Sequence, residues 1–219
     1  MVSVPAGVFL MGSDAGDDDE RPQRRVTVAA FTIDRTEVTT RAYAACVAAG
    51  ACASTDRKPR CNEGVAGRGE HPINCVSFAA ATAYCAWRGA RLPTETEWEY
   101  AARGPVGRTY PWGDARPRAQ LCWDGPGNDV GAFKRQGTCP VGSYLAGRSP
   151  FGLDDMAGNV WEWTSDIYPS EEGAPADEPL RVSRGGTWFG YDPYDVRSPL
   201  RFRTRPQAQG YGIGFRCAR

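Results

Sequence analysis

HPINCVSFAAATAYCAWRGARLPTETEWEYAARG, residues 71–104, carries the clearest signals of secondary structure in the chain. Its first half predicts a helix over 77–89, because Ser77 is a typical N-cap residue and Gly89 is a typical residue for ending a helix. Apolar side chains gather near one face of this helix, so we expect that face to pack against a core.

A second helix is predicted over 94–104. Thr94 and Glu97 form a capping box, and the acidic residues of the first turn suit the positive end of the helix dipole. A weaker helical pattern covers 39–50, which a glycine ends. The helices are therefore expected in the first half of the chain.

Regular structure is expected to be sparse elsewhere. Two short strands are predicted within 24–39, and others within 181–188 and 212–219. Residues 104–180 read mostly as turns, and the chain contains 26 glycines and 17 prolines. These features predict a single α+β domain over residues 1–219, with low regular secondary structure and long loops that disulfides or cations stabilise.

The composition is that of an ordinary globular protein. The 219 residues suit one large domain or two small ones, and 26 Lys and Arg balance 26 Asp and Glu. A net charge near zero gives no reason to expect nucleic acid or an anionic membrane as a partner. The chain has no apolar run of the roughly 20 residues that a membrane span needs.

Eight cysteines, without any C-x-x-C pair, favour disulfides over a zinc site. Disulfides persist in oxidising compartments, so we expect an extracytoplasmic protein that is secreted, periplasmic or lipoprotein-anchored. The first residues do not read as a signal peptide, so an exported protein would have its signal missing from this sequence. Local spacing suggests one set among the many possible pairings: Cys46–Cys52, Cys61–Cys75, Cys122–Cys139 and, as the remaining pair, Cys85–Cys217.

Several stretches together resemble the formylglycine-generating enzyme, or sulfatase-modifying factor, family. Besides residues 71–104 they are VPAGVFLMGS (4–13), FTIDRTEVTTRAYAACV (31–47), YPWG (110–113), FGLDDMAGNVWEWTSD (151–166), RVSRGGTW (181–188) and GFRCAR (214–219). The resemblance covers nearly the whole chain. It implies a single-domain variant of the C-type lectin fold with little regular structure, and it also implies the bridge between Cys85 and Cys217.

The best-known activity of this family is the oxidation of a sulfatase cysteine to formylglycine by molecular oxygen. Its members hold copper(I) with two cysteines in a C-x-x-x-x-C spacing after the R-G-G-[ST]-[WY] segment, and the matching positions here fall near Asp195 and Leu200. Residues 140–216 contain no cysteine, and Met156 is the only sulfur in that range. Copper(I) prefers thiolate or thioether ligands, so we expect neither copper nor the copper-dependent oxidation.

Another branch of the family consists of iron-dependent sulfoxide synthases, which use three histidines. The chain contains one histidine, His71, so we expect no iron centre of this type. A Ser-His-Asp triad would also have to use His71, which precedes Pro72. We interpret His71 as a structural residue of a turn.

The resemblance implies a structural Ca²⁺ in DDMAGNVWEW, residues 154–163. Its ligands would be the Asp155 side chain, the carbonyls of Gly158 and Val160, and the Glu162 carboxylate. Calcium prefers such oxygen ligands, and it would stabilise a long loop as a disulfide does. The alternative is that the two carboxylates cap turns and accept backbone N–H groups.

A second calcium site of the family would lie within 118–142, where the match is poor. Gln120 replaces an expected Asn, and no acidic residue has the expected spacing. Asp124 or Asp129 would have to replace the missing acidic ligand. The tryptophans Trp87, Trp98, Trp161 and Trp163 are expected in the core, because large aromatic side chains dominate core burial.

YDPYDVRSPLRFRTRP, residues 191–206, is the best candidate for a binding surface. It mixes aromatic residues with arginines, as recognition surfaces do, and it loosely resembles the variable region of variable proteins of diversity-generating retroelements. The candidate ligand-binding residues are Trp188, Tyr191, Asp192, Tyr194, Asp195, Arg197, Arg201 and Phe202. Alternatively, the arginines are internal supports that pair with Asp192, Asp195 or carbonyl groups.

The function that we expect is that of a cysteine-less family member acting as a monomeric binding or accessory module. Its ligand would be a protein, a peptide or a glycan. The alternatives are an active oxidase that uses copper or another metal, a variable protein of a diversity-generating retroelement, and the sensory domain of a larger protein.

Overall fold

The computed structural model of the chain describes residues 1–55, 58–169 and 179–219. Three α-helices occur in these ranges: α1 (Thr40–Ala48), α2 (Phe78–Trp87) and α3 (Glu95–Arg103). The strands are β1 (Val2–Val4), β2 (Gly7–Met11), β3 (Arg24–Val28), β4 (Phe31–Ile33), β5 (Trp161–Ile167), β6 (Arg181–Arg184), β7 (Phe202–Thr204) and β8 (Ile213–Gly214). Short 3-10 turns cover Asp18–Glu20, Leu145–Gly147 and Pro193–Val196.

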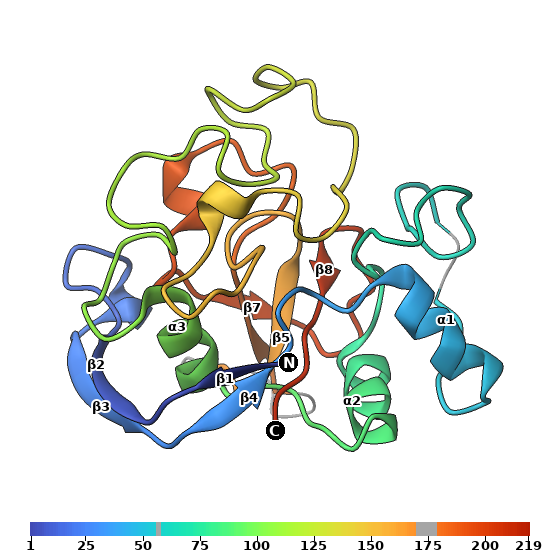
Figure 1. The fold of residues 1–219 in the computed structure, drawn as a ribbon, viewed down its shortest axis with the longest axis horizontal. Coiled ribbons are helices and arrows are strands. Elements are labelled where there is room, and N and C mark those ends of the chain that lie inside the picture. Colours follow the sequence, from blue (N-terminus) through green and yellow to red (C-terminus); the bar gives the residue numbers. More distant parts are fainter. Residues whose placement is uncertain (56–57, 170–178) are drawn as a thin grey trace.

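The strands form three small sheets (Figure 1). β1 pairs with β4 and β2 pairs with β3, both antiparallel. The largest sheet has the order β7-β6-β5-β8, in which β5 and β8 run parallel. With few helices and several short sheets, the chain is a mixed α+β domain, as the sequence predicts.

The central strand β5 lies in a range that the sequence analysis reads mostly as turns, and this strand was not predicted. Glu162 and Trp163 point to opposite faces of the strand and are both buried, so the usual polar–apolar alternation is not visible at these positions. Glu162 is tolerated there because Arg216 and Trp98 bind its carboxylate.

The two faces of the four-stranded sheet have different neighbours. Successive residues of a strand point to opposite faces, and Glu162 and Arg184 point towards α3, where they contact Trp98 and Glu99. Trp163 points to the other face, where Phe78 of α2 packs edge-on against its ring with the ring centroids 5.9 Å apart. The helix α2 covers only part of that face, and the uncovered part forms a groove.

The helices begin where their caps predict. Thr39, Ser77 and Thr94 each accept a hydrogen bond from the backbone N–H three residues later, and Thr94 forms the predicted capping box with Glu97. Trp87 corrects one expectation, because 43% of it is exposed at the end of α2 instead of lying in the core. No helix of the described ranges has the length and apolar character that crossing a membrane requires.

Four disulfides form in the same pairs that the cysteine spacing suggests, and three of them close short loops. Cys85–Cys217 is the longest link and joins α2 to the C-terminal segment. The backbones of Thr32 and Arg219 exchange two hydrogen bonds, of 2.9 and 2.8 Å. The two chain ends therefore lie close together in Figure 1.

Candidate ligand-binding groove

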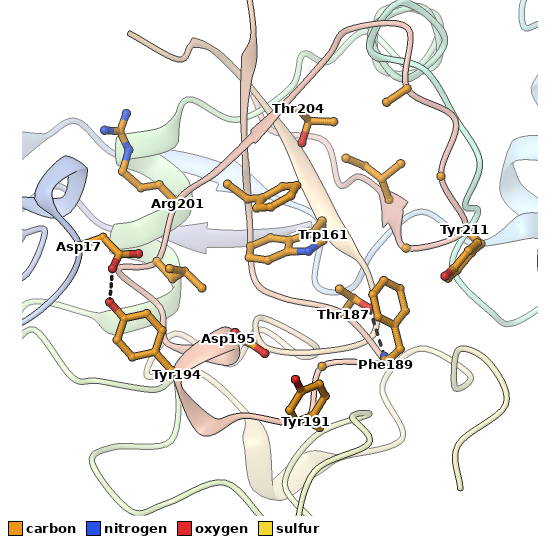
Figure 2. Close-up of a pocket in the computed structure, with 17 residues that line it drawn as sticks. Asp17, Trp161, Thr187, Phe189, Tyr191, Tyr194, Asp195, Arg201, Thr204 and Tyr211 are labelled. Atoms are coloured by element: carbon orange, nitrogen blue, oxygen red, sulfur yellow. Dashed lines mark hydrogen bonds between the residues drawn. The ribbon is translucent and has the colours of Figure 1, made fainter. Parts of the chain in front are cut away.

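An open groove of about 620 Å³ lies on the part of the sheet that α2 leaves uncovered. Its floor is built by Trp161 of β5, Phe202 and Thr204 of β7, and Ile213 of β8 (Figure 2). The rings of Trp161 and Phe202 stack with centroids 5.1 Å apart and planes inclined by 18°. The floor is therefore a flat aromatic platform.

The walls of the groove come from loops. On one side, Tyr194 and Asp195 project from the 3-10 turn Pro193–Val196. On the other side, Phe189 and Tyr211 pack against each other with centroids 5.2 Å apart. Figure 2 shows Tyr191 between these two sides. Aromatic rings thus surround the cavity from several segments that are far apart in sequence.

The aromatic side chains of the groove remain partly accessible. Tyr191 is 57% exposed and Phe202 is 48% exposed, and Phe189, Tyr194 and Tyr211 are exposed to a lesser degree. Outside the cavity, Phe133 contacts the Tyr191 ring at a centroid distance of 5.6 Å and extends the aromatic surface. An exposed apolar patch of this kind commonly marks a binding surface.

The groove also contains acidic groups. Asp195 lines it, and burial together with the neighbouring Asp192 raises the pKa of the Asp195 carboxyl. Asp17 reaches the groove from the N-terminal part of the chain and accepts a hydrogen bond of 2.6 Å from the Tyr194 hydroxyl. Burial and this bond raise the pKa of Tyr194 to about 12, so its hydroxyl stays protonated.

The arginines near the groove are held by carboxylates. Arg201 lines the groove, and its guanidinium binds both oxygens of Glu95 at 2.6 and 2.9 Å. Arg197 is buried and binds both oxygens of Glu20, at 3.1 and 2.7 Å. Both arginines act as supports, which is the alternative that the sequence analysis left open. Arg201 donates to the Asp19 carbonyl at 2.8 Å, but the carboxylate partners are Glu95 and Glu20 instead of Asp192 or Asp195.

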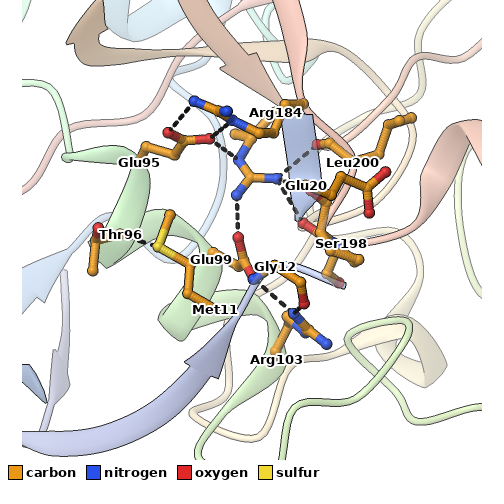
Figure 3. Close-up of polar contacts among 12 residues, drawn as sticks. Met11, Gly12, Glu20, Glu95, Thr96, Glu99, Arg103, Arg184, Ser198 and Leu200 are labelled. Carbon is orange, nitrogen blue, oxygen red and sulfur yellow. Dashed lines mark hydrogen bonds and ion pairs between the residues drawn. The ribbon is translucent and has the colours of Figure 1, made fainter. Parts of the chain in front are cut away.

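A buried arginine fixes the segment that leads into β7. Arg184 donates to the carbonyls of Ser198, Pro199 and Leu200, at 3.1, 2.6 and 2.7 Å, and its guanidinium also pairs with Glu99 (Figure 3). Because bonds from a charged donor are stronger than neutral ones, this guanidinium holds the backbone of the groove wall in place.

The structure brings together five of the eight residues that the sequence predicted as ligand-binding. These are Tyr191, Tyr194, Asp195, Arg201 and Phe202. Trp188 is only 2% exposed and packs beside the Cys122–Cys139 bridge. Asp192 accepts a hydrogen bond of 2.9 Å from the Tyr194 backbone and so caps the 3-10 turn. Neither these two nor Arg197 lines the groove.

Sequence reasoning missed several residues of the groove. Asp17 lies far away in the sequence, and nothing in its local pattern connects it with the groove. Trp161 was assigned to the core, yet it is only partly buried and forms the floor. Phe189 and Tyr211 flank the predicted stretch on either side, and their aromatic character is the only signal that could have included them.

Asp195 and Leu200, near which the family resemblance places the two copper-binding cysteines, both line the groove. One carries a carboxylate and the other an aliphatic side chain. Neither provides the soft sulfur ligand that copper(I) prefers.

The four residues predicted to hold calcium lie below the groove, around the start of β5. Asp155 is buried and accepts a hydrogen bond of 2.6 Å from the Gly142 backbone. Burial raises its pKa to about 6. Both oxygens of Glu162 bind Arg216 at 2.7 Å, and one of them also accepts from Trp98 at 2.8 Å.

The charges around this loop are not balanced. Burial, with the nearby carboxylates of Asp155 and Glu162, raises the pKa of Glu37 well above its usual value, and Glu37 Oε1 is buried without a hydrogen-bond partner. The described residues contain no group of three or more His, Cys, Asp or Glu side chains arranged to hold a metal. A cation at this loop would therefore depend on the carbonyls of Gly158 and Val160 in addition to carboxylates.

In the second candidate calcium region, Arg135 contacts both candidate carboxylates. Arg135 pairs with Asp129, and its backbone N–H donates to Asp124 at 2.8 Å. The Tyr144 hydroxyl also donates to Asp129, at 2.8 Å. Both candidate carboxylates are thus used within the protein, and we assign no second metal site.

His71 is part of a structural hydrogen-bond network. Its Nδ1 lies 2.9 Å from the Thr138 hydroxyl, which also accepts from Asn62 at 2.9 Å. Burial and the positive charge of Arg68 lower the pKa of His71 to about 4. The ring is therefore neutral near pH 7, with Nδ1 acting as an acceptor.

Known proteins are similar to this chain in both sequence and fold. The model of the sulfatase-modifying factor enzyme 1-like domain matches residues 1–219. A Mus musculus protein named inactive C-alpha-formylglycine-generating enzyme 2 is 35% identical over 267 residues, which covers 100% of this chain and 85% of the mouse protein.

Two solved structures resemble this one closely. PvdO from Pseudomonas aeruginosa has a TM-score of 0.78 and 33% identity, with coverage of 99% of this chain and 92% of PvdO. Treponema denticola variable protein 1 has a TM-score of 0.75 and 22% identity, with coverage of 100% and 94%. The second likeness shows a shared fold only.

Proposed function

Because the chain belongs to the sulfatase-modifying factor family, we propose that it is a binding or accessory module of that family in which the former copper site has become a ligand-binding groove. The observation that carries this proposal is the position of Asp195 and Leu200. Both line the groove, near the positions where the family resemblance expects the copper-binding cysteines. The groove is therefore present, but it lacks the thiolates that copper(I) prefers.

The groove has the properties of a recognition site. A cavity of about 620 Å³ with an aromatic floor is large enough for a peptide side chain or a sugar ring. The ion pairs of Arg197 and Arg201 fix its walls before any ligand arrives, which lowers the entropy cost of binding. The ligand would be a protein, a peptide or a glycan.

Calcium and location belong to the same proposal. Two carboxylates and two loop carbonyls around the start of β5 would give a hard cation the oxygen donors that it favours, with Arg216 sharing the Glu162 carboxylate. Glu37 Oε1, buried near these carboxylates, has no hydrogen-bond partner of its own. Calcium held by Asp155, Gly158, Val160 and Glu162 would stabilise the loop under the groove. Four disulfides support an extracytoplasmic location.

Ligand arrays test the binding role. We expect the purified chain to bind a defined subset of an immobilised peptide or glycan array. Trp161→Ala should weaken binding of those hits at least tenfold, because stacking surfaces often dominate binding energy. Trp87→Ala is the matched control, since Trp87 is exposed on α2 away from the groove. Equal losses in both variants, or no specific binding on either array, would contradict the proposal.

A further inference from the structure

The Asp195 carboxylate lies in the groove without a cationic partner. It is half-buried, and no ion pair joins it to a Lys, Arg or His of the described ranges. The only group that lowers its pKa is the backbone N–H of Asp192, while burial and the Asp192 charge both raise it. A carboxylate in such a position is costly unless an opposite charge compensates it.

The other charged groups of the groove are already engaged. Arg201 pairs with Glu95, which also lies 3.2 Å from the buried Arg184, and Asp17 accepts a hydrogen bond from the Tyr194 hydroxyl. The Cζ atom of Arg60 lies 5.3 Å from the centre of the Tyr211 ring, on the side of the groove opposite Asp195, and Arg60 does not line the cavity. Among the described residues, the charges of the groove that lack an ion-pair partner are therefore negative, and they lie at Asp195 and Asp17.

Aromatic rings surround this carboxylate. Figure 2 shows Asp195 between Tyr191 and Tyr194, with Trp161 on the floor above it in the view. The face of an aromatic ring carries negative electrostatic potential and attracts cations. The same wall already attracts cations of the chain itself, since Arg197 lies 3.7 Å from the centre of the Tyr194 ring on its buried side.

From these contacts, and resting on the binding role proposed above, we infer that the ligand of the groove carries an organic cation, an ammonium or a guanidinium group, that binds against Asp195 between the rings of Tyr191, Tyr194 and Trp161. A carboxylate within an aromatic enclosure provides both a charge partner and ring faces for such a group. A neutral ligand would leave the charge of Asp195 uncompensated, and an anionic ligand would be repelled by it.

Four short peptides that differ only in one side chain test this inference. Each is a blocked tripeptide with phenylalanine at both ends and a central lysine, trimethyl-lysine, arginine or ε-acetyl-lysine. Isothermal titration calorimetry with the whole chain should show that at least one cationic peptide binds about tenfold more tightly than the neutral acetyl-lysine peptide. The cationic peptide that binds best identifies the preferred headgroup.

Two variants assign the preference to Asp195. Asp195→Asn should remove the tenfold difference between the cationic peptides and the acetyl-lysine peptide. Asp18→Asn is the control, because the Asp18 side chain is fully exposed, lies nearby in the acidic segment and does not line the groove. Adding salt should weaken only the cationic peptides in the unmodified chain, which provides a second readout that needs no variant.

The outcomes separate this inference from the proposed function. If the acetyl-lysine peptide binds as tightly as all cationic peptides, or if Asp195→Asn keeps the difference, the cation inference is wrong while the groove still binds ligands. If no peptide binds at millimolar concentration and the arrays also give no hits, the binding role of the groove is wrong, and the cation inference falls with it.

Discussion

Arg197 Nη2 lies 2.7 Å from Glu20 Oε1, although the two residues are 177 positions apart in the sequence. Glu20 is buried at the end of a 3-10 turn near the N-terminus, and Arg197 is buried behind the groove wall. The guanidinium also stacks under the Tyr194 ring. This contact fixes a wall of the groove to the N-terminal segment that supplies Asp17.

Removal of the Arg197 charge should destabilise the protein strongly. In Arg197→Met the Glu20 carboxylate stays buried without its partner, which typically costs about 3–5 kcal/mol. Chemical denaturation monitored by tryptophan fluorescence measures this change. Arg41→Ala is the control, because Arg41 and Glu70 form an exposed pair that contributes about 0–1 kcal/mol. A loss below about 1 kcal/mol in Arg197→Met would contradict the structural role given to this pair.

The Cys85–Cys217 bridge should contribute more to stability than Cys46–Cys52. The first closes a separation of 132 residues and the second a separation of 6 residues. On the chain-entropy model, their removal costs about 5 and about 2 kcal/mol respectively. Double Cys→Ala variants of each pair, compared in thermal unfolding without reductant, measure the difference. Equal losses would show that strain or structure in the unfolded chain outweighs loop closure.

The single histidine should make stability depend on pH. The folded pKa of His71 is about 4, below its ordinary value of 6.5, so the unfolded chain binds more protons between these values. The stabilising contribution of neutral His71 is therefore complete above pH 6.5 and is lost as the pH falls towards 4.

His71→Asn removes this titration but keeps an acceptor close to the position of Nδ1. We expect the free energy of unfolding to fall more between pH 7 and pH 5 in the unmodified chain than in this variant. The raised pKa values of Glu37 and Asp155 act in the opposite direction, but they are present in both proteins. Identical pH profiles would show that His71 does not titrate differently in the folded state.

Chelation should lower the thermal stability of the protein. Elemental analysis is expected to find about one equivalent of calcium, and calcium at about 100 times its Kd should raise Tm by about 5–10 °C over the chelated protein. Asp155→Asn should reduce this shift, whereas Asp18→Asn should keep it, since Asp18 is exposed. A Tm that does not respond to calcium would contradict the proposed calcium site.

Local signals in the sequence were sufficient to predict the helices. The caps at Ser77 and Thr94 act within one helical turn, so they can be read without knowledge of the fold. The strand β5 could not be read in this way. Its Glu162 is buried because Arg216 binds it from 54 positions away, and a pattern within the strand does not reveal that partner.

The groove was predictable only in part, for the same reason. The aromatic composition of residues 191–206 identified Tyr191, Tyr194 and Phe202 as surface residues. The roles of the arginines depended on carboxylates more than 100 positions away, so exposed and buried arginines looked alike in the sequence. Asp17 joined the groove through the tertiary fold alone.

The most direct test of the central claim is incubation of the chain with a C-x-P-x-R peptide, copper(I) and oxygen, followed by mass spectrometry of the peptide. Because residues 140–216 contain no cysteine that could hold copper(I), the account predicts that the cysteine of the peptide remains unchanged. An active formylglycine-generating enzyme, treated in parallel, should convert the same peptide. Formylglycine in the sample with this chain would contradict the account and would show that the chain is an active oxidase.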